Sequence, residues 1–256
     1  MRLTWHVTAS DAGRIKRLLS DSRSHPLVRA RRERNLAAQR PRVRLPGFWH
    51  ALCGTLLTTQ QRSGPKSPVT RFLAARPFPL SYARVSAARD IAGYVTGELT
   101  RFGGIRRSTN IGAELVANHE KLSAGLWKQL DPMLARLSSS VNAALEREVA
   151  NVLNDSLMGI GPKQSRNLLQ GLGLTRYEIP LDSRLMKWLN EFGFPLQLNA
   201  TALSDRHYYE FVSDGVQALC GAAKVAPCLF DAAVFASFDT DEWSDPVTFE
   251  WGYSGD

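Results

Sequence analysis

Lys163 and Asp182 are the two residues of this 256-residue chain whose types and spacing best suit covalent chemistry. A lysine amine is a nucleophile once it loses its proton, and burial near the positive end of a helix lowers its pKa toward neutrality. A nearby aspartate could accept that proton or stabilise positive charge on a substrate. Each residue also has an ordinary interpretation, because helix starts commonly carry solvated lysines and capping aspartates.

The elements that must position Lys163 are two amphipathic helices joined by a short turn. Apolar residues recur at helical spacing on both sides of this turn: Val149, Val152, Leu153 and Leu157 before it, and Leu168, Leu169 and Leu172 after it. Gly159 and Gly161 permit a tight turn, and Pro162 suits a first helical position. The pattern predicts a helix-hairpin-helix within residues 149–172, whose second helix presents free N–H groups to a phosphate. A plain helix connection is the alternative.

Asp182 ends the segment Ile179-Pro180-Leu181-Asp182, which precedes a further amphipathic helix. Gly159-Ile160-Gly161-Pro162-Lys163 followed at this spacing by that segment resembles the helix-hairpin-helix DNA glycosylases. The lysine is typical of their 8-oxoguanine DNA glycosylase/AP lyase branch. The resemblance covers residues 46–238.

The resemblance implies a bifunctional enzyme that excises an oxidised purine, 8-oxoguanine first, from double-stranded DNA. Lys163 would attack the sugar and form a Schiff base, and Asp182 would accept a proton or stabilise charge on the sugar. Two alternatives stay open: a glycosylase for another modified base, and a non-catalytic helix-hairpin-helix protein whose Lys163 only neutralises a phosphate.

The resemblance also implies a pocket for the extruded base. Phe235 would stack on the base and Asp231 would bind its polar edge, and their spacing of four places them on one side of a helix. Because an ionised carboxylate accepts hydrogen bonds only, Asp231 suits the two donors of a guanine-type base. Asn167 stands where the human-type enzyme has a cysteine against the base. Core packing is the alternative for Phe235.

Further DNA-binding residues follow from the same resemblance, together with Gly159 and Gly161 of the hairpin. Gln60 or Gln61 would fill the gap that the extruded nucleotide leaves in the duplex. Arg107 matches the arginine that addresses the orphaned base, and Arg106 stands in place of an aromatic wedge. Arg184 replaces a histidine and could contact a phosphate.

The net charge of +8 is concentrated near the N-terminus. Residues 1–45 hold twelve Lys or Arg and three Asp or Glu, whereas residues 239–256 hold six acidic residues and no Lys or Arg. We therefore expect a basic N-terminal extension (1–45), a core (46–238) and an acidic C-terminal tail (239–256). The extension could bind phosphates by counterion release, or it could be a solvated helix face or a disordered tail.

Composition and periodicity predict an all-α fold with two helical subdomains flanking a DNA-binding cleft. Helical patterns begin at residue 47, cover 69–73, 82–99, 111–130 and 141–157 with a polar break at 138–140, and recur to residue 238. The three cysteines are scattered and have neither zinc nor cluster spacing, so we expect no metal and no cofactor. Without a signal peptide or membrane span, a cytoplasmic monomer is expected, associated with the nucleoid if bacterial.

Overall fold

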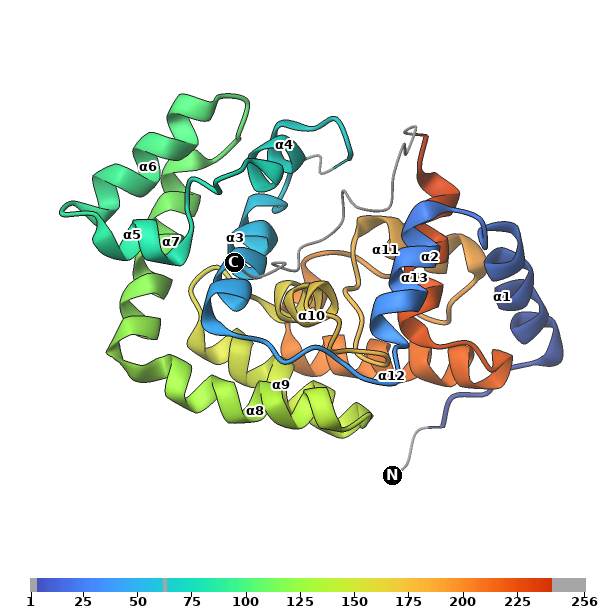
Figure 1. Ribbon diagram of the computed structural model, residues 1–256. Helices are drawn as coiled ribbons and strands as arrows, with labels where there is room; N and C mark the ends of the chain where they lie inside the picture. Colours follow the sequence, from blue (N-terminus) through green and yellow to red (C-terminus); the bar gives the residue numbers. More distant parts are fainter. Residues whose placement is uncertain (1–3, 62–63, 241–256) are drawn as a thin grey trace.

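The computed structural model describes residues 4–61 and 64–240, and this part of the chain is all α, without strands, as predicted (Figure 1). A π-turn at Leu122–Leu126 and a 3-10 turn at Ala202–Ser204 interrupt the α-helices. The helices are α1 (Ala9–Asp21), α2 (Pro26–Asn35), α3 (Leu45–Leu57), α4 (Pro68–Ala74), α5 (Tyr82–Ala87), α6 (Ile91–Phe102), α7 (Ser108–Lys121), α8 (Trp127–Ser139), α9 (Ala143–Ser156), α10 (Pro162–Gly171), α11 (Ser183–Phe192), α12 (Arg206–Ala223) and α13 (Pro227–Phe238).

Two separate hydrophobic cores organise these helices. The first core is built by α3 to α10 and includes Trp49, Phe72 and Leu153. The second is built by α1, α11, α12 and α13 and includes Ile15 and Phe230. In Figure 1, α10 is the helix of the first group that lies next to the second group. We call these groups the first lobe and the second lobe.

The basic N-terminal segment belongs to the second lobe. The predicted boundary at residue 45 had separated this segment from the core. Helix α1 packs on α12 and α13, and α2 packs along α13. Ile15 is fully buried in the second core, and Leu27 and Val28 are buried against Ala232. Residues 9–35 are therefore neither a tail nor a purely solvated face. The predicted acidic tail lies outside the described residues beyond position 240.

Helix boundaries follow local capping signals. A break between α8 and α9 is present but lies at 140–142, later than the predicted 138–140, because α8 continues to Ser139 and the Asn142 side chain accepts the Leu145 N–H at 3.0 Å to start α9. The single helix predicted over 82–99 is wrong. It divides into α5 and α6 because the Asp90 side chain accepts the Gly93 N–H at 2.9 Å and starts a new helix. The helix predicted over 111–130 is interrupted at Gly125, whose φ is 116°.

In the described part of the chain, no single helix is both long and apolar enough to cross a membrane. Helices α12 and α13 reach that threshold only together, with a bend of 94° between them. Both supply buried residues to the second core. The three cysteines are free and buried.

Candidate active site

The turn between α9 and α10 is held from both sides by Asn118 of α7. The buried Asn118 amide donates to the Met158 carbonyl at 2.9 Å and accepts the Met158 N–H at 2.7 Å. Gly159 has φ 77°, and a Cβ there would lie 2.7 Å from the Glu114 carboxylate. A side chain at this position would be strained by the backbone conformation and would displace the ends of the Glu114 and Leu56 side chains. The turn fixes where α10 begins, and with it Lys163.

Lys163 is the second residue of α10, and its side chain is half-buried. Burial lowers the pKa of the Lys163 amine, and the neighbouring carboxylates of Asp182 and Asp231 oppose this effect. An amine in these surroundings is neutral more often than a solvated lysine, with two carboxylates nearby that could take its proton.

Asp182 is fixed as the N-cap of α11. Its Oδ1 accepts the Leu185 N–H at 2.9 Å, while Oδ2 lies 3.9 Å from Nη1 of Arg184. The preceding segment is fixed by the fully buried Tyr209 of α12. The Tyr209 hydroxyl donates to the Ile179 carbonyl and accepts the Leu181 N–H, both at 2.8 Å. Tyr209 thus holds the backbone that leads directly into Asp182.

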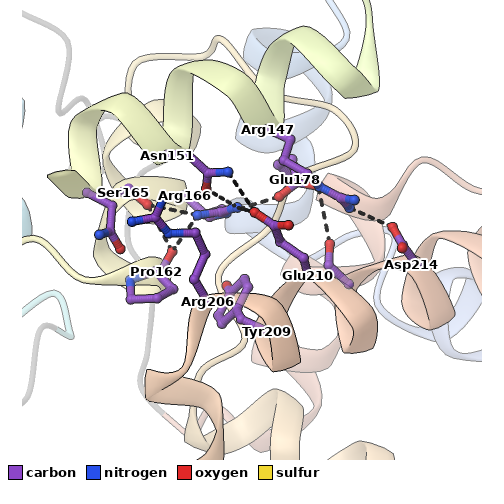
Figure 2. Close-up of polar contacts among 12 residues, drawn as sticks. Arg147, Asn151, Pro162, Ser165, Arg166, Glu178, Arg206, Tyr209, Glu210 and Asp214 are labelled. Atoms are coloured by element: carbon purple, nitrogen blue, oxygen red, sulfur yellow. Dashed lines mark hydrogen bonds and ion pairs between the residues drawn. The ribbon is translucent and has the colours of Figure 1, made fainter.

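A buried polar network connects Tyr209, whose hydroxyl holds the backbone at Ile179 and Leu181, to α10, the helix of Lys163 (Figure 2). Arg166 of α10 is fully buried, with its guanidinium 5.0 Å from the centre of the Tyr209 ring. Its Nε donates to Glu178 at 3.0 Å, and its Nη2 donates to Asn151 of α9 at 3.0 Å. Glu178 also accepts from Arg147 of α9 at 2.8 Å. The network fixes α9, α10, α12 and the Asp182 segment relative to one another.

A cavity of about 870 Å³ brings most of the predicted site residues together. It is lined by residues from both lobes, so it lies where they meet. The predicted residues in its lining are Gln60, Gln61, Arg106, Gly161, Lys163, Asn167, Asp182, Arg184, Asp231 and Phe235. Gly159 and Arg107 do not line it.

Arg107 faces the hairpin instead of the cavity. It has φ 57° at the start of α7, and its Nη2 lies 3.7 Å from Oε1 of Glu114. Glu114 in turn lies against Gly159. Arg106 is exposed and lines the cavity, so of the two arginines it is the one placed to reach a ligand there.

The two glutamines at the end of α3 have different surroundings. Gln61 donates to the Leu57 carbonyl and accepts the Arg106 N–H at 2.9 Å, so it braces the loop before α7. Gln60 is exposed and has φ 58°. The hydrogen bonds of Gln61 hold its side chain in the protein, so Gln60 is the better of the two candidates for entering a duplex.

Asp231 and Phe235 face the cavity from α13, as their spacing of four predicts. The Arg184 guanidinium lies 4.3 Å from the centre of the Phe235 ring. Asp231 Oδ2 accepts the Gln170 amide at 2.7 Å and lies 3.9 Å from Nη2 of Arg31. Burial raises the pKa of Asp231 to about 6, although Arg31 opposes this rise.

Several residues of the site were missed by sequence reasoning. Arg31 and Asn35 of α2 and Gln170 of α10 line the cavity beside Asp231. In the sequence, Arg31 is one of a run of arginines, and only the tertiary packing distinguishes it. Arg166 was missed as well, because the residues one helical turn away include the polar Lys163 and Gln170 and do not mark a buried face.

Comparison of the chain with protein-family models, with curated proteins and with solved structures finds no match.

Proposed function

We propose that this protein is a DNA glycosylase with AP lyase activity, which removes a damaged purine from duplex DNA through a Schiff base on Lys163. One observation carries the proposal: a half-buried lysine with a lowered pKa shares one cavity with Asp182, Asp231 and Phe235. The resemblance of the Gly159–Lys163 and Ile179–Asp182 segments to the helix-hairpin-helix glycosylases supports the same class.

The chemistry begins with the Lys163 amine, which donates its lone pair to C1′ of the deoxyribose. The bond from C1′ to the base breaks, and the base leaves with the bonding electrons and gains a proton from solvent. One amine proton passes to Asp182, the C1′–O4′ bond breaks, and O4′ keeps the bonding electrons and takes up a proton, which leaves a protonated imine between Lys163 and C1′. Removal of a C2′ proton then expels the 3′ phosphate by β-elimination. No electrons are gained or lost overall.

Duplex DNA would contact the start of α10. A Cβ on Gly161 would meet only Gln164, at an ordinary 3.6 Å, so internal packing does not require a glycine there. A bare backbone at a helix N-terminus does favour close approach of a phosphate. Arg106 and Arg184 add positive charge along the same cavity.

The surroundings of Lys163 favour an enzyme over a non-catalytic DNA-binding protein. A lysine that only neutralises phosphate works best when solvated and free of competing anions. Lys163 is instead half-buried, with Asp182 and Asp231 both acting on its charge. Such an arrangement suits an amine that must lose its proton.

The direct test is reductive trapping with borohydride on duplexes carrying single lesions, namely 8-oxoguanine, 8-oxoadenine, uracil and thymine glycol. We expect a covalent adduct with wild type and none with Lys163→Gln, while duplex affinity stays within a few fold. Lys187→Gln is the matched control, because Lys187 is exposed on α11 and pairs with Glu191 at 3.8 Å. Absence of an adduct with every lesion would favour the non-catalytic alternative. Trapping by Lys163→Gln at the wild-type level would place the nucleophile elsewhere.

A second variant tests the role of Asp182. Asp182→Asn keeps a helix-capping side chain but removes the charge, so binding should persist while excision falls by about 100-fold or more. Asp205→Asn is its control, because Asp205 also caps a helix, accepting the Tyr208 N–H at 2.8 Å. If Asp182→Asn excises bases as fast as Asp205→Asn, the Asp182 carboxylate has no part in the reaction.

A further inference from the structure

Resting on the proposed function, we propose that Arg31 of α2 is a specificity-determining residue of the base pocket. Together with Asp231 it would select guanine-type bases. Arg31 donates to O6 of the extruded base, while Asp231 accepts from N1–H and the N2 amine. The basic N-terminal segment thereby takes part in base recognition.

The position of Arg31 beside Asp231 is the first support. Arg31 Nη2 lies 3.9 Å from Asp231 Oδ2, and both side chains are mostly buried but keep a small exposed part, 15% and 13%. Arg31 Nη1 donates to the Gln170 carbonyl at 3.3 Å, and Asn35 donates to the same carbonyl at 3.2 Å. Helix α2 is thus anchored at the end of α10, with Arg31 and Asp231 both in the cavity lining.

The second support is a group of buried polar atoms that lack hydrogen-bond partners within the described residues. They are Nε of Arg31, Oε1 of Gln170 and Oδ1 of Asn35. Gln170 and Asn35 are almost completely buried, at 1% and 0% exposure, and both line the cavity beside Asp231. Buried polar groups normally find a partner in the protein or in water. All three atoms belong to residues of the cavity lining, which indicates a place for a polar ligand.

The pattern of donors and acceptors decides which base fits. The Watson–Crick edge of guanine presents an acceptor at O6 and donors at N1 and N2, which matches one arginine donor beside two carboxylate acceptors. Adenine presents an amine donor at position 6, directed at Arg31, and an acceptor at N1, directed at Asp231. Both contacts would then be unsatisfied. Thymine and uracil offer one donor to the carboxylate where guanine offers two.

Arg31 also favours the ionised form of Asp231. The titratable groups that face the Asp231 carboxylate are Arg31 from α2, Lys163 from α10, Asp182 at the start of α11, Tyr209 from α12 and Cys228 on α13 itself. The Gln170 amide also donates to it and lowers its pKa. Arg31 opposes the rise in the pKa of Asp231 and so favours the carboxylate, the form that accepts both guanine donors.

The test compares single-turnover excision of 8-oxoguanine, 8-oxohypoxanthine and 8-oxoadenine by wild type, Arg31→Met and Arg31→Lys at pH 8. Hypoxanthine keeps O6 and N1–H but lacks the amine, whereas adenine lacks O6. In Arg31→Met the ratio of 8-oxoguanine to 8-oxoadenine excision should fall by at least about tenfold. The ratio of 8-oxoguanine to 8-oxohypoxanthine should stay near the wild-type value. Arg31→Lys, which keeps a charged donor, should be intermediate.

Arg32→Met is the matched control, because Arg32 is the exposed neighbour on the same helix and does not line the cavity. Ratios within one variant do not depend on how much of the protein is folded. An unchanged ratio in Arg31→Met would contradict the role of Arg31, as would loss of all three reactions in both Arg31 variants. If wild type releases none of the three bases and forms no adduct, the proposed function itself is wrong.

Discussion

At the scale of single residues, Asp182 and Asp231 are two carboxylates beside one lysine with different surroundings. Asp182 caps a helix and keeps 27% of its side chain exposed. Asp231 is more buried, and its pKa is raised to about 6. This difference suits a division of roles in which Asp182 serves the reaction at the sugar and Asp231 binds the base.

The raised pKa of Asp231 predicts a measurable pH dependence of stability. Because the folded state binds this proton more tightly than the unfolded state, the contribution to stability is present below the unfolded value of 3.8 and is lost as pH rises through about 6. The free energy of unfolding of wild type minus that of Asp231→Asn should therefore fall by roughly 3 kcal/mol between pH 3 and pH 8. Urea unfolding at several pH values measures it. A difference independent of pH would show that the carboxyl titrates alike in both states.

Sequence reasoning identified residues of the cavity where a local pattern carries the information. Lys163 and Asp182 stand in recognisable segments, and Asp231 and Phe235 share a helix face. Sequence reasoning did not identify Arg31 as a cavity residue. Its position depends on how α2 packs along α13, and the run of arginines around it does not specify that packing. The resemblance matched Arg107 to an arginine that addresses the orphaned base, and this role stays a prediction; in the structure Arg107 pairs with Glu114 beside the hairpin.

At the scale of elements, the structure holds two helix starts, those of α10 and α11, in a fixed relation. Hairpin and capping signals are local in sequence, which is why the turn and the start at Asp182 could be predicted. The contacts that lock the two starts together are not local. Arg166 of α10 donates to Glu178 in the segment before Asp182, and Tyr209 holds that segment from α12.

Tyr209→Phe is predicted to slow excision by about tenfold while changing duplex affinity little. The substitution keeps the ring over Arg166 but removes the hydroxyl that holds the backbone at Ile179 and Leu181, so Asp182 loses its precise position. Stability should fall by about 1 to 3 kcal/mol as well. Single-turnover excision and binding are measured in parallel.

Tyr208→Phe is the control for this prediction, since Tyr208 is the half-buried neighbour on the same helix. A purely structural role for Tyr209 would lower stability without slowing excision by the folded enzyme. Equal excision rates for Tyr209→Phe and Tyr208→Phe would therefore show that the Tyr209 hydroxyl does not position Asp182 for the reaction.

At the scale of the whole molecule, the N-terminal segment is a structural part of the second lobe, which charge counting could not reveal. Deleting residues 1–36 would remove Ile15, Leu27 and Val28 and expose the apolar surfaces of α12 and α13 that they cover. Burial of three such side chains contributes about 5 to 9 kcal/mol, comparable to the stability of a whole domain.

We therefore predict that this truncation unfolds the second lobe, seen as loss of the cooperative thermal transition and of helical circular dichroism. The control is the double variant Arg29→Ser/Arg32→Ser, which removes two exposed positive charges and leaves the core intact. The same control variant tests whether the basic segment binds phosphates, since the slope of log affinity against log salt would then decrease. A truncated protein with the wild-type melting temperature would show that the segment is a separable extension.

The role of Lys163 as the nucleophile is tested most directly by finding which residue carries the trapped sugar. Wild-type protein is reduced with borohydride on an 8-oxoguanine duplex, digested with nuclease and protease, and analysed by tandem mass spectrometry. We expect the reduced sugar remnant on Lys163, the half-buried amine of the cavity. Attachment to any other amine, or base release without an adduct on the protein, would contradict this expectation.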